Sequence, residues 1–258
     1  MGSAKKIARG AVWTTMANII NGIYGFISVP LLIVYFGKSN YGLIGLALSV
    51  NVYLNLMDLG LNSTNVRFFS NWLAKGDRDG VNKLFGTSMS FYGVVGLLNA
   101  VIMVVMGLFA RQIFHLNEEQ GTILMHLFFI LAISAFISWY TSCFDQLIKA
   151  NEYVGWTEQI TLLAKLIQCI VLVLTLTMKF NIETFYALTT YSMFIVIPFC
   201  IHKIKKLCPY IKFRPHFDKA IFKEILPYSL NIFSFGIFQF SFYNLRPVFL
   251  GLQGTPSD

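Results

Sequence analysis

Seven apolar runs, each long enough to form a membrane-spanning helix, dominate this sequence of 258 residues. A helix rises about 1.5 Å per residue, so about 20 apolar residues cross a hydrocarbon core of about 30 Å. Charged residues make up only 12% of the chain, against about 25% in soluble domains. We therefore expect an all-α integral membrane protein, a polytopic helix bundle with about seven transmembrane helices, at roughly 11–36, 41–61 (continuing to about 74), 84–109, 122–147, 160–178, 185–201 and 225–252.

The positive charges predict how the bundle is oriented. With the N-terminus in the cytoplasm, the outer loops hold only Lys38, Arg111 and Lys179, whereas fourteen Lys and Arg residues lie in the inner segments. This bias predicts a cytoplasmic N-terminus. The formal charge of +8 lies in these connectors, so we expect contact with membrane lipids and no nucleic acid partner. The first run has no cleavage site and is expected to stay as a helix.

The longest connector, residues 202–219, is basic and divides the chain. We expect residues 1–220 to form an N-terminal six-helix transmembrane lobe and residues 221–258 to hold the first helix of a C-terminal lobe. The last residues, Gly-Thr-Pro-Ser-Asp, have the composition of a helix start. The chain is therefore expected to be a truncated piece of a longer protein.

Polar residues recur every three or four positions in five of the runs, which places them on one face of each helix. Hydrogen bonds between helices account for Ser, Thr and Asn, but Asp, Lys and Arg cost about 2.5–3.5 kcal/mol each at mid-membrane. A water-filled central cavity explains both classes. The polar stripes are Thr14, Asn18, Asn21, Gly25 and Ser28; Asn51, Asn55, Asp58, Asn62 and Asn65; Ser134, Ser138, Thr141 and Asp145; Glu158, Thr161, Lys165, Gln168 and Cys169; and Gln239, Tyr243 and Arg246.

From these stripes we predict a substrate-binding cavity lined by Asn18, Asn21, Asn51, Asn55, Asp58, Arg67, Lys165, Gln168, Gln239, Tyr243 and Arg246. Asp58 has two open interpretations, a functional carboxylate and a structural hydrogen bond to a neighbouring helix end. Asp145 and Lys149 are spaced for a local ion pair. Arg67 has the position of a side chain that extends to the inner headgroups.

No catalytic or metal-binding arrangement is found in the sequence. The four histidines and four cysteines lack the spacing of metal ligands, and neither a phosphate-binding glycine loop nor a nucleophile elbow is present. We predict no enzyme activity, no cofactor and no metal.

Three segments resemble a known family. The opening GAVWTTMANIINGIYGFISVPLLIVYFGKSNYGLIGLALSVNVYLNLMDLGL is similar to that of the polysaccharide-export flippases of the O-antigen translocase type. These belong to the multidrug/oligosaccharidyl-lipid/polysaccharide exporter superfamily. PLLIVYFGKSNYGL (30–43) and DLGL (58–61) are the most specific parts, and NLRPVFLG (244–251) is also similar. The family's seventh helix often carries an Asp-Arg pair; Arg246 matches its basic member, while Asn244 and Leu245 stand where the acid would be.

The resemblance implies a flippase with two lobes that rock around a central cavity. Its cargo would be an undecaprenyl-pyrophosphate-linked oligosaccharide (O-antigen, capsule or a related repeat unit of lipopolysaccharide biosynthesis) crossing the bacterial cytoplasmic (inner) membrane, with glycan polymerase or assembly proteins as partners. Arg246, Lys165 and Arg67 would bind the pyrophosphate in a polar, basic cavity. Three alternatives stay open: a lipid II flippase, a cation-coupled drug exporter with Asp58 as coupling site, and a non-transporting scaffold of a glycan assembly complex.

Overall fold

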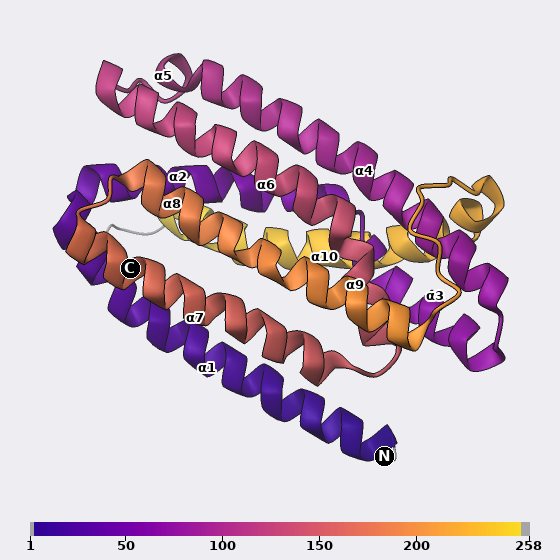
Figure 1. The fold of residues 1–258 in the computed structure, drawn as a ribbon. Helices are drawn as coiled ribbons and strands as arrows, with labels where there is room; N and C mark the ends of the chain where they lie inside the picture. Colours follow the sequence, from indigo (N-terminus) through magenta and orange to yellow (C-terminus); the bar gives the residue numbers. More distant parts are fainter. Residues whose placement is uncertain (1–2, 254–258) are drawn as a thin grey trace.

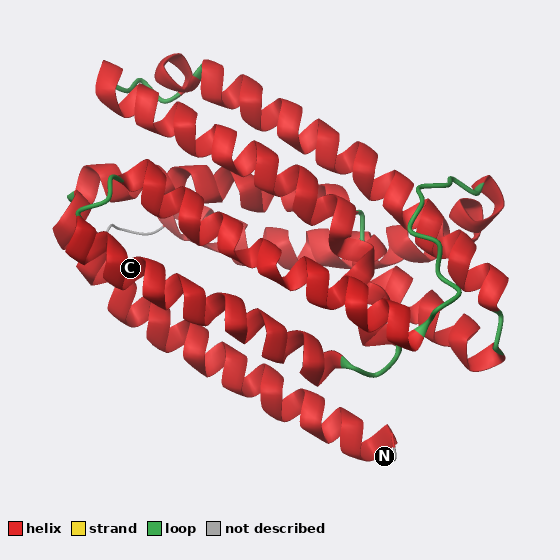
Figure 2. Ribbon diagram, viewed as in Figure 1, coloured by secondary structure: helices red, strands yellow, loops and turns green. Residues whose placement is uncertain are grey.

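A computed structural model of the chain describes the backbone of residues 3–253, and the side chains of residue 8 and residues 10–236. Within residues 3–253 every regular element is a helix (Figure 2). In chain order these are α1 (Ser3–Phe36), α2 (Lys38–Leu54), the 3-10 turn η1 (Asn55–Asp58), α3 (Leu61–Lys75), α4 (Arg78–Leu108), α5 (Ala110–Ile113), α6 (Glu118–Ala150), α7 (Val154–Met178), α8 (Ile182–Tyr191), the 3-10 turn η2 (Ser192–Ile195), α9 (Val196–Leu207) and α10 (Lys219–Gln253).

The all-α membrane bundle predicted from the sequence is confirmed. Among the described residues, five helical segments are long and apolar enough to cross a membrane, and the bent pair α2–α3 is a sixth. The seventh predicted span, 225–252, falls within α10, whose side chains beyond residue 236 lie outside the description. The prediction was wrong in one respect: the second span is broken at 55–60 and does not run on as one helix to residue 74.

Two long helix pairs form the frame of the bundle (Figure 1). α4 lies along α6, and α1 lies along α7. The first pair approaches closely at Gly96, where an added Cβ would lie 2.9 Å from the Cβ of Trp139, and at Gly107, where it would lie 3.1 Å from the ring of Phe129. Small residues at such contacts are typical of membrane helices, because packing there depends on close backbone approach.

Several helices begin at an Asp or Asn side-chain cap. Asp77, Asn117 and Asn181 each accept a hydrogen bond from the backbone N–H three residues later, at 2.9, 2.8 and 2.9 Å. Asp218 accepts from the N–H of Ala220 at 2.9 Å at the start of α10. These bonds satisfy N–H groups that a helix start leaves unpaired, so local chemistry sets where these helices begin.

The basic connector before α10 is packed on α4. The side chain of Asn82 donates to the carbonyl of Tyr210 and accepts from the N–H of Lys212, both at 2.9 Å. His216 donates its N–H to the carbonyl of Gly86, at 3.2 Å. The connector therefore fixes the direction in which α10 enters the bundle.

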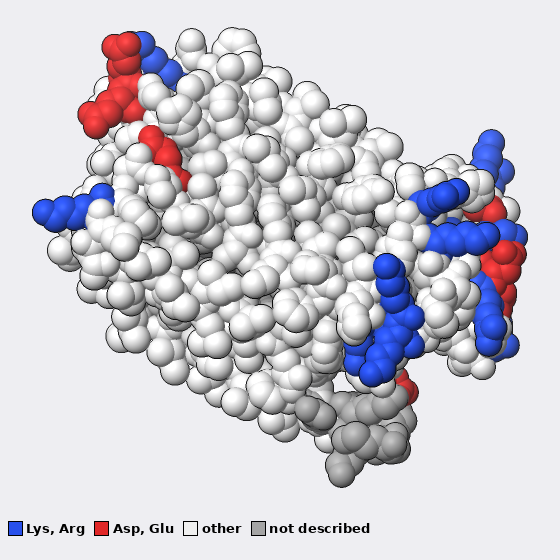
Figure 3. Space-filling view, in the orientation of Figure 1, with Lys and Arg blue, Asp and Glu red and all other residues white. Residues whose placement is uncertain are grey.

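Charge is concentrated at the two ends of the molecule (Figure 3). On the face shown, Lys and Arg gather at the end formed by α3, the start of α4 and the connector after α9, which we call the basic end. The opposite end carries acidic and basic side chains together, and the band between the two ends is uncharged. This distribution is that of a bundle crossing a hydrocarbon layer.

Candidate functional site

Two consecutive residues in the left-handed conformation break the second span. Leu59 has a φ of 52° and Gly60 a φ of 75°, and the helical segments on either side meet at 43°. A left-handed non-glycine residue costs about 1–2 kcal/mol, so surrounding contacts must hold it. Ser229 of α10 donates its hydroxyl to the carbonyl of Leu59, and a Cβ on Gly60 would lie 2.6 Å from the Ser229 carbonyl oxygen. The free carbonyl is thus satisfied within the protein, as membrane burial requires.

A chain of hydrogen bonds links this break to α4 and α6. Tyr92 donates its hydroxyl to Oδ1 of Asp58 at 3.0 Å, Gln146 donates its amide to the Tyr92 oxygen at 2.9 Å, and Asn65 donates to Oε1 of Gln146 at 2.9 Å. The other carboxylate oxygen of Asp58 accepts from the N–H of Asn62 at 3.1 Å. Asp58, at the end of η1, therefore accepts from the first turn of α3 and is joined to α4 directly and to α6 through Tyr92. These contacts are of the kind that the structural alternative for Asp58 predicts.

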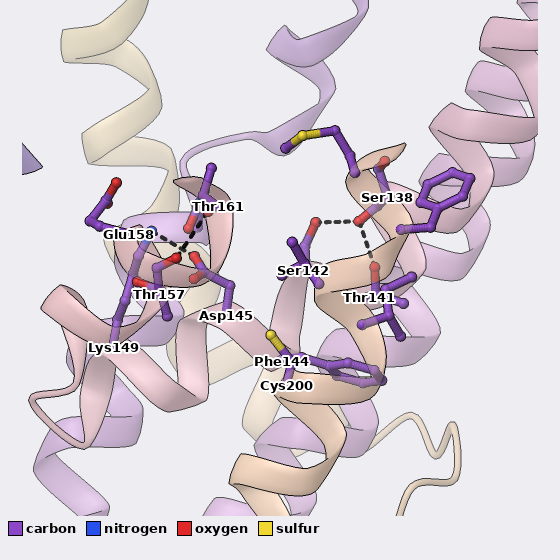
Figure 4. Close-up of a pocket in the computed structure, with 15 residues that line it drawn as sticks. Ser138, Thr141, Ser142, Phe144, Asp145, Lys149, Thr157, Glu158, Thr161 and Cys200 are labelled. Atoms are coloured by element: carbon purple, nitrogen blue, oxygen red, sulfur yellow. Dashed lines mark hydrogen bonds and ion pairs between the residues drawn. The ribbon is translucent and has the colours of Figure 1, made fainter. Parts of the chain in front are cut away.

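Two adjoining hollows open beside this network, between α3, α6, α7 and α9. Figure 4 shows the first of them. One has a volume of about 290 Å³; the other, of about 330 Å³, shares Asn62, Ser138 and Ser142 with it and reaches the break. We call them together the polar cavity. Their polar lining consists of Asn55, Asp58, Asn62, Ser138, Thr141, Ser142, Asp145, Lys149, Thr157, Glu158 and Thr161.

Four of the five hydroxyl groups in the cavity lining donate within their own helices. Thr141, Ser142, Thr157 and Thr161 each donate to a backbone carbonyl three or four residues earlier, at 2.8, 2.8, 2.7 and 3.0 Å. A hydroxyl that donates in this way keeps its oxygen lone pairs for another partner. The wall therefore offers these oxygens as acceptors.

The described wall of the polar cavity differs in charge from the expected basic lining. Lys149 is its one cationic side chain among the described residues, and it pairs with Asp145 at 2.6 Å, as the spacing on α6 predicted. Glu158 is half-buried, and no ion pair reaches it within the described part of the chain. Asp58 is held by neutral donors. The described wall is thus acidic, because Lys165 and Arg67, the two predicted cations whose side chains are described, do not line it.

Lys165 and Gln168 contact each other and not the polar cavity. The ammonium of Lys165 donates to Oε1 of Gln168 at 2.7 Å and lies 4.5 Å from the ring centre of Tyr24 on α1. Gln168 in turn donates to the carbonyl of Thr189 at 3.2 Å. These contacts join α7 to α1 and to α8. They occupy both side chains in an interhelical junction, so the structure assigns neither to the cavity wall.

The remaining predicted residues are divided among several places. Arg67 is exposed, with its guanidinium 4.2 Å from the ring centre of Tyr228 on α10. Asn18 and Asn21 are exposed on α1, and Asn51 is half-buried; none of the three lines the polar cavity. Of the predicted set, the structure brings Asn55 and Asp58 together there. Gln239, Tyr243 and Arg246 lie outside the residues whose side chains are described.

Several cavity residues were not among the predicted site residues. Ser138, Thr141, Asp145, Glu158 and Thr161 lie on polar stripes of α6 and α7, but only the tertiary structure shows that these two stripes face one hollow. Further lining residues are Ser142, Lys149 and Thr157. The sequence pattern that could have identified them is the spacing of four residues, which places Ser142 on the same helix face as Ser138 and Thr157 on the same face as Thr161. No cluster of three metal-ligating side chains occurs in the described residues.

Comparison with known proteins gives a family-level match. A family model described as polysaccharide biosynthesis protein matches residues 7–255. No curated protein matches the sequence. Among solved structures, a multidrug resistance MATE family transporter of the MOP superfamily, in an outward-facing conformation, is similar with a TM-score of 0.72 at 16% identity, over 93% of this chain and 55% of that chain. A point mutant of a MATE protein is similar with a TM-score of 0.77 at 14% identity, over 98% of this chain and 58% of that chain.

At these identities the similarity to the transporters concerns the fold. This chain spans somewhat more than half the length of each of them, at 55% and 58%. Nearly all of the chain is nonetheless included in the match, so the overall arrangement of its helices resembles that of these structures.

Proposed function

This chain belongs to the polysaccharide biosynthesis protein family, and on that premise we propose that it is a flippase for lipid-linked oligosaccharides. The proposed cargo is an undecaprenyl-pyrophosphate-linked repeat unit of O-antigen, capsule or a related glycan. The observation that carries the proposal is the polar cavity, where hydroxyl, amide and carboxylate groups from three helices line one hollow. A glycan that leaves water needs such partners, because unpaired polar groups are costly in a low dielectric.

The polar cavity lies toward one end of the bundle. It is lined by the last part of α6 and the first turns of α7, next to the basic end. We place the basic end and the N-terminus in the cytoplasm, because Lys and Arg are retained on that side. The glycan would enter there, and the lipid tail would stay in the surrounding bilayer. Movement would follow alternating access between this lobe and a second one.

The pyrophosphate is proposed to lie outside the described wall of the polar cavity. Lys165 and Arg67 are directed to Tyr24 and Tyr228, and Lys149 is paired with Asp145. Arg246 stays the proposed phosphate-binding residue of the chain, since a planar guanidinium suits phosphate oxygens. If Arg246→Ala left glycan display intact, this assignment would be wrong.

The proposal is tested by the display of surface glycan in a strain that lacks its own flippase and expresses this protein. Thr161→Val removes a cavity hydroxyl while keeping the shape of the side chain. Thr177→Val makes the same change at an exposed hydroxyl farther along α7. We expect several-fold less displayed glycan with the first variant and no change with the second. Equal display from both, at equal protein levels, would contradict a glycan site in the polar cavity.

A second function is favoured by the acidic wall. Export of cationic drugs requires a pocket of negative charge, and Asp58, Asp145 and Glu158 outnumber Lys149 among the cavity side chains. One similar structure is that of a multidrug resistance transporter. Growth of the same strain in cationic antimicrobials separates the two functions, because only a drug exporter would raise the tolerated concentration.

A further inference from the structure

We infer that the polar cavity selects glycans that offer hydrogen-bond donors, namely neutral sugars and sugars with amino groups, and that it disfavours sugars bearing carboxylate, phosphate or sulfate. This inference rests on the proposed function and adds the chemical class of its cargo. It follows from two independent properties of the described wall: the direction of its hydroxyl protons and the arrangement of its charges.

The hydroxyl groups make the wall rich in acceptors. Thr141 and Ser142 on α6, and Thr157 and Thr161 on α7, donate to carbonyls of their own helices. A ligand that reaches these groups meets oxygen lone pairs. Sugar hydroxyls and ammonium groups donate to such lone pairs, whereas a carboxylate or a phosphate offers acceptors only. An anionic substituent would therefore be left without a partner on this part of the wall.

The charged side chains of the polar cavity also disfavour an anionic sugar. Four charged side chains line the polar cavity: Asp58, Asp145, Lys149 and Glu158. The Asp145–Lys149 pair, at 2.6 Å, is locally neutral. Asp58 and Glu158 have no cationic partner in the described part of the chain. The wall thus carries an excess of negative charge where the glycan would lie.

A nearby cation does not reverse this balance. Lys203 on α9 lies 4.0 Å from the ring centre of Tyr153 and 5.2 Å from that of Trp156. It stacks on these rings and is not part of the cavity lining. Two like charges about 10 Å apart, at an effective dielectric constant of about 20, repel enough to change an equilibrium about tenfold. One carboxylate on the sugar would therefore be strongly disfavoured.

The experiment compares two lipid-linked repeat units that differ in one sugar, glucose in one and glucuronic acid in the other. Each is made in a strain that lacks its own flippase and expresses this protein, and displayed glycan is measured per lipid-linked precursor. We expect about tenfold more display of the neutral unit. Glu158→Gln removes the charge and keeps the shape of the side chain. It should lower the ratio of neutral to acidic glycan displayed by about tenfold.

Two controls make the result specific. Glu158→Asp keeps the charge, and Glu224→Gln removes an exposed carboxylate on α10; both should leave the ratio unchanged. Equal display of the two units by the unaltered protein would overturn the selectivity alone, as would a ratio that Glu158→Gln does not change. Display of neither unit would overturn the proposed function, and this inference with it.

Discussion

The hydroxyl of Tyr92 on α4 lies 3.0 Å from the carboxylate of Asp58, at the point where the second span breaks. The ring of Tyr92 is fully buried, and its oxygen also accepts from Gln146 of α6. One phenol group thus links the break to two other helices. Because Asp58 at the same time accepts from the N–H of Asn62 in the first turn of α3, the bond connects the broken span with the core of the bundle.

Replacement of this hydroxyl should destabilise the protein. Tyr92→Phe keeps the ring but removes the hydrogen bond to half-buried Asp58 and leaves the buried amide of Gln146 without this partner, and an unsatisfied buried group costs about 1–3 kcal/mol. We expect a lower unfolding temperature of the purified protein in detergent, measured by fluorescence. Tyr140→Phe is the matched control, because Tyr140 is half-buried and stacks with Phe136 through its ring. Equal stability of the two variants would show that the network contributes nothing.

The two glycines at either end of α3 give a second test. Gly60→Ala should destabilise strongly, because its Cβ would lie 2.6 Å from the carbonyl oxygen of Ser229 at a φ of 75°. Gly76 has a similar φ of 71° but no atom within 4 Å of the added Cβ. Gly76→Ala should therefore cost only the backbone strain, about 1–2 kcal/mol, and Gly60→Ala clearly more. Thermal unfolding of both variants measures the difference, and equal losses would argue against close α3–α10 packing.

Water access to the polar cavity can be tested with a water-soluble thiol reagent. Ser142→Cys, in a protein whose half-buried Cys169 is replaced by Ala, should react quickly because residue 142 lines the cavity. The native Cys143 is fully buried one position later and should stay unlabelled. Mass spectrometry of the labelled peptides reads both sites in one sample. An unreactive Ser142→Cys would favour a non-transporting scaffold over a hydrated transport cavity.

The proposed orientation predicts which ends of the helices face the periplasm. Lys38 at the start of α2 and Lys75 at the end of α3 are both exposed, at opposite ends of the second span. A membrane-impermeant reagent applied to spheroplasts should label Lys38→Cys and not Lys75→Cys until the cells are opened. The reverse pattern would place the basic end outside and would contradict the positive-inside interpretation.

The stripe from Asn51 to Asn65 shows where sequence reasoning about the site stops. Spacing of three and four places these residues on one face only if the helix is continuous. The left-handed Leu59 and Gly60 interrupt it, so Asn55, Asp58 and Asn62 line the cavity while Asn65 turns inward to Gln146. The left-handed Leu59 is stabilised by α10, from 170 residues away in the chain, and no local pattern records such a contact.

The sequence by itself determined the elements of this protein: apolar runs of membrane length, helix starts at Asn and Asp caps, and charged ends. These properties are local, because length, periodicity and capping act within a few residues. Only the tertiary structure decided which polar faces meet. It brought the stripes of α6 and α7 to one hollow and turned Lys165 and Arg67 toward aromatic rings. The sign of the cavity's charge depends on that packing, because a charged side chain contributes to a site only when its face of the helix lines that site.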